Sequence, residues 1–479
     1  MPNPLTLALK EVREGLLTLR FQAGTVLAVV LVAISVWALA DDYGRRIEGH
    51  SHRVALNEAH LAEYGHLNRL GSVYAVGEVT GPMTAWVRGL SQGTRLEQFD
   101  NDPLPVLFPL VDMVAVITVV FSLLALVFTF DAVTGERRNG TLRLLTTFEL
   151  SRAGVVTGKL LGAVGTVAVP FASSWLVAAL VVVAVSPVPW GPDDWLAAIA
   201  IGLGGLLYAI AFAALGVAIS TVTRRPRTSA FVALAAWVVL VLVIPNLAPF
   251  LAAEARPIPS ATALHRRIAR MTDTERDALQ DRLRQEAFER LQSEDPAVGR
   301  YLELPRDERA AAAATDPALA RAAAKVAEAN TEANREGNRI QGEKVEALQA
   351  DFDRRVDDQV RLARALSLAS PTPAFTYLAT DLAETGLRHR ERLEVQEGEF
   401  ETLFRAWARE KYDRLSAQDP TRDWANTPTD LSDVPRFTYR SEPLSGRLAA
   451  TIPWFVTLTL HGVLFTAVAA FAFGRYDVR

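Results

Sequence analysis

Apolar residues collect in six runs along the chain, each long enough to cross a bilayer as a helix of roughly 20 residues. Charged side chains lie between the runs, and Asp112 is the one acidic or basic residue inside any of them. A helix in a soluble core is not normally apolar all round over such a length. We therefore expect an all-α membrane protein with six transmembrane helices. They are expected at residues 21–40, 106–130, 160–185, 195–219, 229–251 and 450–473.

Residues 1–20, which precede the first run, carry a helical stripe of apolar side chains. The stripe consists of Leu5, Leu9, Val12, Leu16 and Leu19. Lys10, Arg13 and Arg20 lie elsewhere on the same surface, a pattern that predicts an amphipathic helix in the membrane interface. The run that follows is too long, and its flank is of the wrong kind, for a cleavable signal peptide.

Lys and Arg concentrate in alternate loops, which predicts the orientation. Residues 131–159 and 220–228 are rich in arginine, whereas residues 186–194 contain no Lys or Arg. The positive-inside rule then places both termini, including the tail 474–479, and both arginine-rich loops in the cytoplasm. We expect a multi-pass protein of the cell (inner) membrane, with residues 41–105 and 252–449 outside the cytoplasm.

The large outer segment, residues 252–449, is expected to be mostly helical. Two stripes of apolar side chains at spacings of three to five residues, the second running from Ile340 to Val360, predict long amphipathic helices in a hairpin. The alanine-rich stretch 310–324 between them also favours helix. Residues 370–446 are richer in proline and aromatics and suggest a compact mixed cap. Removal of residues 260–440 is expected to spare the six spans.

Composition excludes several classes of function. The formal net charge of −4 argues against a nucleic-acid partner. The absence of cysteine removes disulfides, thiolate nucleophiles and Cys-ligated metal sites. No His-Glu-x-x-His motif and no cluster of carboxylates lies in the spans, so we do not expect a membrane-embedded enzyme, and no catalytic residue is assigned.

The loop 131–159 carries the clearest functional signal. Gly140 is suited to end one element, and Thr141 can cap a short helix with Leu142 and Leu145 on one face. A short capped helix at the membrane surface, with apolar residues directed away from lipid, is suited to docking into a partner. The alternative is a charged connector whose arginines only fix the topology.

This loop resembles the permease subunit of type 2 ABC exporters. The resemblance rests on its position between the second and third of six spans and on the run that begins at Asp131 and ends at Gly158-Lys159. The chain is similar to the branch that includes the permease of the nitrous-oxide-reductase maturation system. A proline often precedes the Ser-Arg pair in that family, whereas this chain has Glu149-Leu150. The insert before the last span, with Ser370-Pro371 and Leu382–Gly386, also resembles a sub-branch of these permeases.

The resemblance implies that the loop forms a coupling helix that seats in a groove of a separate ATPase subunit, and that residues 1–20 form an elbow helix. The implied coupling residues are Asp131, Glu136, Arg137, Arg138, Gly140, Thr141, Leu142, Leu145, Ser151, Arg152 and Lys159. ATP and Mg²⁺ would bind the ATPase, with no cofactor on this chain. The other expected partners are the lipid bilayer and a second permease subunit, identical or similar. Two functions stay open: ATP-driven export, and mechanical transmission to an envelope protein.

Other candidate residues have simpler explanations beside the functional one. Gly154–Lys159 is one residue short of a phosphate loop and follows no strand, so we reject that interpretation. Intramembrane polar residues are functional candidates, yet Asp112 can cap a helix and His461 can be a satisfied packing residue. Asn246 lies in the run Ile244–Pro249, where we expect a break in the helix and a place for a gate. His50, His52, His60 and His66 suggest a solvated helical loop more strongly than a metal site.

Overall fold

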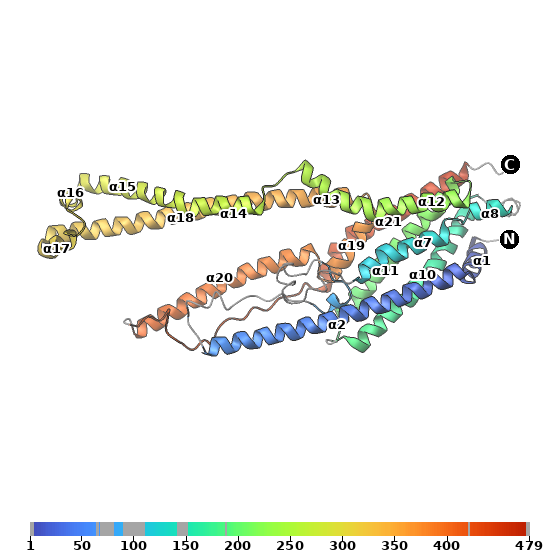
Figure 1. Ribbon diagram of the computed structural model, residues 1–479, viewed down its shortest axis with the longest axis horizontal. Helices are drawn as coiled ribbons and strands as arrows, with labels where there is room; N and C mark the ends of the chain where they lie inside the picture. Colours follow the sequence, from blue (N-terminus) through green and yellow to red (C-terminus); the bar gives the residue numbers. More distant parts are fainter. Residues whose placement is uncertain are drawn as a thin grey trace. The chain divides into compact units, whose positions relative to one another are not determined.

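The computed structural model describes residues 4–63, 67, 81–89, 111–140, 152–186, 189–419 and 422–475. The described residues form helices and no strand (Figure 1). They divide into two compact units, one of Met1–Asn246 with Ser367–Arg479 and the other of Leu247–Leu366. We call the first unit the bundle and the second the arm.

The described residues contain six helical segments long and apolar enough to cross a membrane, which confirms the predicted fold class. The elements of the bundle are α1 (Pro4–Leu16), α2 (Leu19–Glu63), the short 3-10 helix η2 (Pro82–Ala85), α6 (Met113–Ala115), the π-helix η3 (Val116–Phe121), α7 (Ser122–Thr129), α8 (Thr134–Asn139), α10 (Arg152–Val185), α11 (Pro192–Val222), α12 (Pro226–Trp237), the π-helix η4 (Val238–Val243), α19 (Pro371–Leu382), α20 (Leu387–Gln418) and α21 (Leu444–Gly474). The fifth span continues from α12 and η4 into α13 (Ile244–Ala255).

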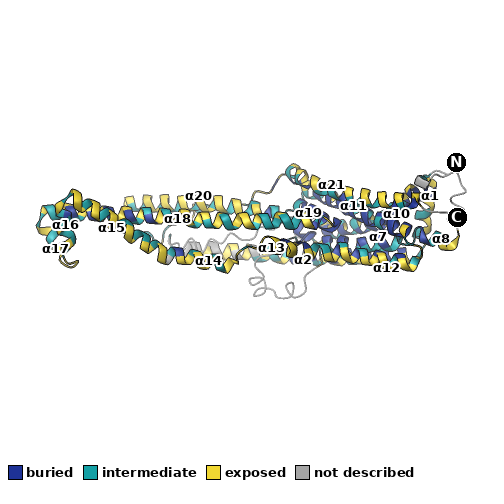
Figure 2. Cartoon of the chain, turned by 90° about the horizontal axis from the view of Figure 1, so that it is seen from above, coloured by how far each residue is buried: buried dark blue, intermediate teal, exposed yellow. Residues whose placement is uncertain are grey.

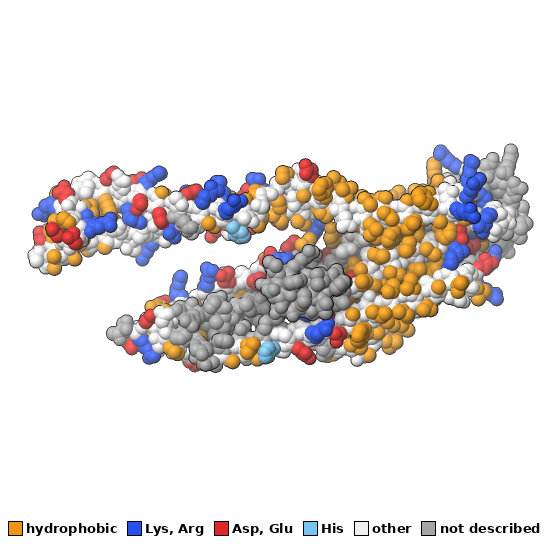
Figure 3. Space-filling view, viewed as in Figure 1, with side chains coloured by type: hydrophobic (Ala, Val, Ile, Leu, Met, Phe, Trp, Pro, Cys, Tyr) orange, Lys and Arg blue, Asp and Glu red, His pale blue; other side chains and the backbone are white. Residues whose placement is uncertain are grey.

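Large apolar side chains cover the outside of the bundle (Figure 3). Leu180 of α10, Phe231 of α12 and Leu460 of α21 are each more than half exposed. In water such a continuous apolar surface would promote aggregation, whereas in a bilayer it faces hydrocarbon. The surface of the bundle is therefore that of a membrane-embedded protein.

Glycines in the fourth span, α11, allow its neighbours to approach closely, as the sequence predicts. A Cβ atom on Gly202 would lie 2.9 Å from the indole of Trp175, and one on Gly205 would lie 3.0 Å from the ring of Phe171. A Cβ atom on Gly204 would lie 2.8 Å from Leu378. Small residues at helix contacts are a general means of tight packing in membranes.

We expect Gly204→Ala to destabilise the bundle by about 1–3 kcal/mol, because the fully buried Leu378 has no space to move away from the added methyl group. The matched control is Gly462→Ala in α21, where the new Cβ would meet only Ala211, at 4.0 Å. Thermal unfolding of the two variants in the same detergent checks this prediction. Equal melting temperatures would contradict it.

The first span is longer than its apolar run predicts. The run ends at Ala40, but α2 continues without interruption to Glu63, through part of the expected loop 41–105. Asp41 pairs with Arg45 at 3.4 Å and Asp42 with Arg46 at 3.0 Å, both one helical turn apart. Such pairs support a helix outside the membrane, so the end of the hydropathy signal does not mark the end of the helix.

The expected helix break at Ile244–Pro249 is absent. The chain passes through this run as α13, and the six residues before it, Val238–Val243, form a π-helix. A π-helical carbonyl bonds to the N–H five residues ahead, and for Leu240 that residue is Pro245, which has no N–H. The hydroxyl of Ser370 donates to this carbonyl instead, at 2.5 Å. A side-chain hydroxyl thus satisfies a backbone group that proline leaves unpaired.

The hydroxyl donor, Ser370, begins a helix that the sequence analysis placed in an outer cap. Helix α19 lies inside the bundle instead, packed against α11 and α21 (Figure 2). Phe375 and Leu378 are fully buried, and the hydroxyl of Tyr208 lies 3.0 Å from that of Thr372. Because Leu240 is midway along the fifth span, the start of α19 reaches the middle of the membrane region.

The predicted outer domain 252–449 is therefore not one domain. Residues 247–366 form the arm, and residues 367–443 belong to the bundle. An apolar segment of only 12 residues, such as α19, is too short to span the bilayer and is suited to a buried or re-entrant helix. Hydropathy alone did not identify it as part of the bundle.

The arm is a helical hairpin, as its two stripes predict. Its helices are α14 (Ala261–Arg270), η5 (Met271–Glu275), α15 (Arg276–Glu294), α16 (Pro296–Glu303), α17 (Arg309–Thr315) and α18 (Pro317–Ser367). Lys325 of α18 pairs with Asp295 at 2.8 Å, and Gln280 of α15 bonds to Asn338 of α18 at 3.0 Å. Val298 is fully buried in a small apolar cluster at the tip.

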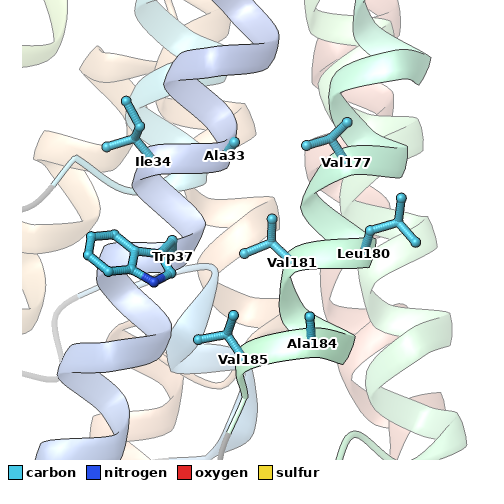
Figure 4. A pocket seen from close by; sticks show the side chains of 8 residues that line it. All are labelled: Ala33, Ile34, Trp37, Val177, Leu180, Val181, Ala184 and Val185. Carbon is cyan, nitrogen blue, oxygen red and sulfur yellow. The ribbon is translucent and has the colours of Figure 1, made fainter.

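An apolar groove of about 440 Å³ lies between α2 and α10 (Figure 4). Ile34 and Trp37 line it from α2, and Leu180 and Val181 line it from α10. Every residue of its lining is apolar, so the groove offers nothing to a water-soluble ligand and continues the hydrocarbon-facing surface.

Candidate coupling site

One end of the bundle carries α1, α8 and the end of α21 (Figure 1), and the predicted coupling residues meet there. Lys159 of α10 is the centre of this site, with a side chain only 1% exposed. Its ammonium group lies 2.8 Å from Glu136 of α8 and 3.1 Å from Glu11 of α1. A buried ammonium needs such partners, because an unpaired charge is costly to remove from water. One lysine thereby joins three helices.

The position of α8 depends on hydrogen bonds from α11 as well. The hydroxyl oxygen of Ser220 accepts bonds from the backbone N–H groups of Val133 and Thr134, at 3.0 and 3.1 Å. It therefore caps the N-terminus of α8, although it lies 86 residues away in the sequence. Arg137 donates to the backbone carbonyl of Thr223 at 3.0 Å, at the end of α11. These bonds attach α8 to the fourth span.

The start of the loop is attached to the first and fifth spans. Arg20 of α2 pairs with Asp131 at 3.1 Å, and its guanidinium lies 5.7 Å from the ring centre of Phe130. Ser229 of α12 donates to the carbonyl of Phe130 at 2.5 Å. The segment from Phe130 to Arg137 thus contacts several of the membrane helices through specific polar bonds.

Helix α1 packs on α10 through two glycines next to the lysine. A Cβ atom on Gly158 would lie 2.8 Å from Leu7, and one on Gly162 would lie 2.6 Å from Glu11. Leu5 and Leu9, on another side of α1, are 58% and 70% exposed. The helix therefore has one face on the bundle and a second apolar face available to the membrane interface. Because Gly154–Lys159 is part of α10, it is a helix rather than a phosphate loop.

The remaining predicted coupling residues fall at or beyond the end of α8. Gly140 ends α8 in the left-handed conformation, with φ of 74°, as the sequence predicts. Arg138 is exposed one turn before it. Arg152 is the first residue of α10. Thr141, Leu142, Leu145 and Ser151 lie outside the described residues, so the docking helix stays a prediction.

The intramembrane polar candidates all have local partners. Asp112 caps the second span by accepting the N–H of Ala115 at 2.8 Å. Asn246 donates to the carbonyl of Leu242 at 2.7 Å. Nδ1 of His461 lies 2.9 Å from the carbonyl of Thr457, one turn earlier. The structure brings none of the three into the coupling site, and their roles are those of capping and helix-local bonding.

The histidine cluster of the first loop adds no metal site within the described part of the chain. His52 is an exposed residue of α2, and His66 lies outside the described residues. No group of three metal-binding side chains occurs among the residues that were described.

Three residues of the coupling site escaped the sequence analysis: Glu11, Ser220 and Thr223. Glu11 and Lys159 are 148 positions apart, and no local pattern links them. The available signal was the position of Glu11 on the polar face of α1, and the position of Ser220 where the fourth span gives way to an arginine-rich loop.

The whole chain matches one known family. The family model described as "ABC-2 family transporter protein" matches residues 5–478. No curated protein sequence matches the chain.

Proposed function

We propose that this chain, which belongs to the ABC-2 transporter family and is thus the membrane permease subunit of an ABC transporter, is part of an ATP-driven exporter. In this proposal the α8 loop receives the motion of a separate ATPase subunit, and the spans move a substrate out of the cytoplasm or membrane. ATP and Mg²⁺ bind the ATPase, and this chain binds no cofactor.

The observation that carries the proposal is the node at Lys159. Through it a displacement of Glu136 on α8 is delivered to α10 and α1, while Ser220 and Arg137 deliver it to α11. A solvated connector would not need a buried ammonium between two carboxylates. Rigid-body movement of packed helices is an established way to turn such a displacement into opening of a pathway.

The orientation and the assembly are parts of the same proposal. Arg13, Arg224 and Arg225 are exposed at the α8 end of the bundle, which supports placing this end, with both termini, in the cytoplasm of a cell with an inner membrane. A second permease subunit completes the pathway. The large exposed apolar side chains of the fifth span, among them Phe231 at 73% exposure, supply surface for it in addition to lipid contact.

A cross-linking experiment tests the orientation of α8 toward the ATPase. The chain contains no cysteine, so a benzophenone probe can be attached to a single Asn139→Cys, the exposed last residue of α8. We expect light to cross-link this variant to its cognate ATPase subunit. The control, Ala417→Cys near the far end of α20, should give no such product. Equal products from both sites, or none from Asn139→Cys, would refute the proposal.

A second function, mechanical transmission to an envelope protein without transport, is favoured by one feature. Helix α2 runs unbroken from the first span to Glu63, well beyond the apolar run. A continuous rod is suited to carry motion away from the membrane. Stimulation of ATPase activity by a candidate substrate would favour export, and a stable complex with an envelope protein would favour transmission.

A further inference from the structure

A short turn, Ala383–Gly386, joins the core helix α19 to the long helix α20, which leaves the bundle at the end opposite to α8 (Figure 1). Within it Glu384 has φ of 53°, and it is the only non-glycine residue with positive φ in the described part of the chain. Side chains rarely adopt this conformation, and where they do the surrounding contacts must hold it. The turn is therefore held by its neighbours rather than by local preference.

The carboxylate of Glu384 is held by the segment that leads into the sixth span. Its Oε1 accepts the backbone N–H of Glu442 at 2.7 Å, and the hydroxyl of Tyr439 lies 3.4 Å away. Arg447 of α21, whose side chain is 6% exposed, lies 3.9 Å from Glu384 and donates to the carbonyl of Leu382 at 2.9 Å. The turn is thus bonded to α21.

The first turn of α20 is bonded to the same segment. Arg388 donates two bonds to Glu442, at 2.9 and 2.6 Å, in the bidentate geometry that makes arginine–carboxylate pairs strong. This pairing holds the pKa of Glu442 below its usual range. Nδ1 of His389 lies 3.0 Å from the hydroxyl of Tyr439, and burial lowers the pKa of this histidine, which keeps it neutral near pH 7.

The end of α19 is fixed from its other sides. The indole N–H of Trp454 in α21 donates to Asp381 at 3.0 Å. A Cβ atom on Gly89 would lie 2.3 Å from the backbone carbonyl of Thr385, so the segment after η2 touches the turn directly. Three separate parts of the bundle therefore converge on the junction of α19 and α20.

Ion pairs elsewhere on α20 are of a different kind. Arg390–Glu394, Glu401–Arg405 and Glu410–Arg414 link successive turns of the same helix, and all six side chains are more than half exposed. Such pairs contribute little to stability. The side chains of Glu442, Arg447 and Glu384 are 8%, 6% and 16% exposed, which marks the junction as a buried and specific joint.

We propose that this joint, made of Glu384, Arg388, His389, Tyr439, Glu442 and Arg447, is a second mechanical coupling site, at the end of the bundle opposite to α8. It fixes α20 to the core helix α19 and to the sixth span, so that these three helices move as one rigid body. Motion of the spans is then carried to α20, and a load on α20 is carried to α19. The source of that motion rests on the function proposed above, whereas the rigid attachment does not.

Distance measurements between spin labels test the joint without any ATPase. Exposed positions on α20 and α21 are converted to cysteine, as Leu403→Cys and Val463→Cys, in the full chain in nanodiscs. We expect a narrow distance distribution. Glu442→Gln, which removes the charged partner of Arg388, and Glu384→Gly, which removes the carboxylate and suits the backbone, should each broaden it. The control Glu394→Gln removes an exposed partner on the same helix and should leave the width unchanged.

A second label pair, Leu180→Cys with Val463→Cys, reports the bundle alone and should keep its width in every variant. A broad distribution in the unaltered joint would overturn the proposal. So would an unchanged width in both joint variants, equal broadening in the control, or broadening of the bundle pair, since the last result would mean that these residues only stabilise the fold. Because no ATPase is present, none of these results depends on the role of α8.

Discussion

Alanine at both Glu136 and Arg137 is expected to release the ATPase subunit from the purified chain, or to leave it bound with its activity uncoupled, while the six spans stay inserted. Glu136 is one of the two carboxylates on Lys159, and Arg137 is the bond between α8 and the end of α11. Without them α8 keeps its N-terminal cap on Ser220 but loses its attachment to α10 and Thr223.

The size of the effect follows from burial. Removal of one partner from a buried ion pair costs about 3–5 kcal/mol, and this is an upper limit here because Glu11 remains beside Lys159. The hydrogen bond of a charged group such as Arg137 adds about 1.5–3 kcal/mol. Both losses fall on the position of α8, since the apolar spans do not depend on these side chains for insertion.

Co-purification of the ATPase and its rate of ATP hydrolysis measure the effect, and membrane fractionation reports insertion. The matched control is Lys10→Ala with Glu14→Ala, an ion pair of 3.6 Å on the neighbouring α1 in which both side chains are more than half exposed. It removes one acid and one base without touching Lys159. Unchanged co-purification and activity in the Glu136 and Arg137 variant, with insertion intact, would exclude a coupling role for these residues.

The sequence predicts those parts of the fold that depend on one helix at a time. The six spans follow from apolar length, because bilayer thickness sets the length of each helix. The hairpin of the arm follows from the period of its apolar stripes, and the end of α8 follows from Gly140, which adopts the predicted left-handed turn. In these cases the energetic requirement is local, so the pattern is visible in the sequence.

Features that depend on two distant segments could not be predicted in this way. The seat of α19 exists because Pro245 has no N–H and Ser370 supplies a hydroxyl to the carbonyl of Leu240, 130 positions earlier. The node at Lys159 requires Glu11 from the other end of the first half of the chain. A single sequence contains these residues but not their pairing, and an apolar segment of 12 residues gives too weak a hydropathy signal to distinguish a buried helix from a cap.

The extension of α2 is an intermediate case. The pairs Asp41–Arg45 and Asp42–Arg46 are visible as acid and base four residues apart, an arrangement that stabilises exposed helices. The end of the apolar run at Ala40 was nevertheless taken as the end of the helix. The membrane requirement and the helix requirement are different physical constraints, and only the first ends at the bilayer surface.

Two deletions in the large insert are expected to have opposite effects, and the difference depends on α19. Removal of residues 257–358 takes away nearly all of the arm and should leave a folded bundle. The ends to be joined are close, because the side chain of Gln359 donates to the backbone carbonyl of Arg256 at 2.7 Å. A linker of a few Gly and Ser residues can therefore close the gap without strain.

Removal of residues 260–440 should destroy the bundle instead, contrary to what the sequence suggests. This deletion takes α19 out of the interior, where Phe375, Leu378 and Leu382 are fully buried. Truncation of a single buried Leu or Phe costs about 2–5 kcal/mol, so the loss of three, together with the bonds of Ser370 and Thr372, exceeds the 5–15 kcal/mol that stabilises an ordinary protein.

Size-exclusion profiles and melting temperatures in one detergent separate the two outcomes. The shorter deletion should elute as a single symmetric peak with a melting temperature near that of the full chain, and the longer one should aggregate or fail to accumulate. A linker that restores the length of the 260–440 segment without its sequence controls for the loss of the connection, and it should not rescue folding. If that variant were as stable as the shorter deletion, α19 would contribute nothing to the bundle, and residues 252–449 would be the separate outer domain that hydropathy alone predicts.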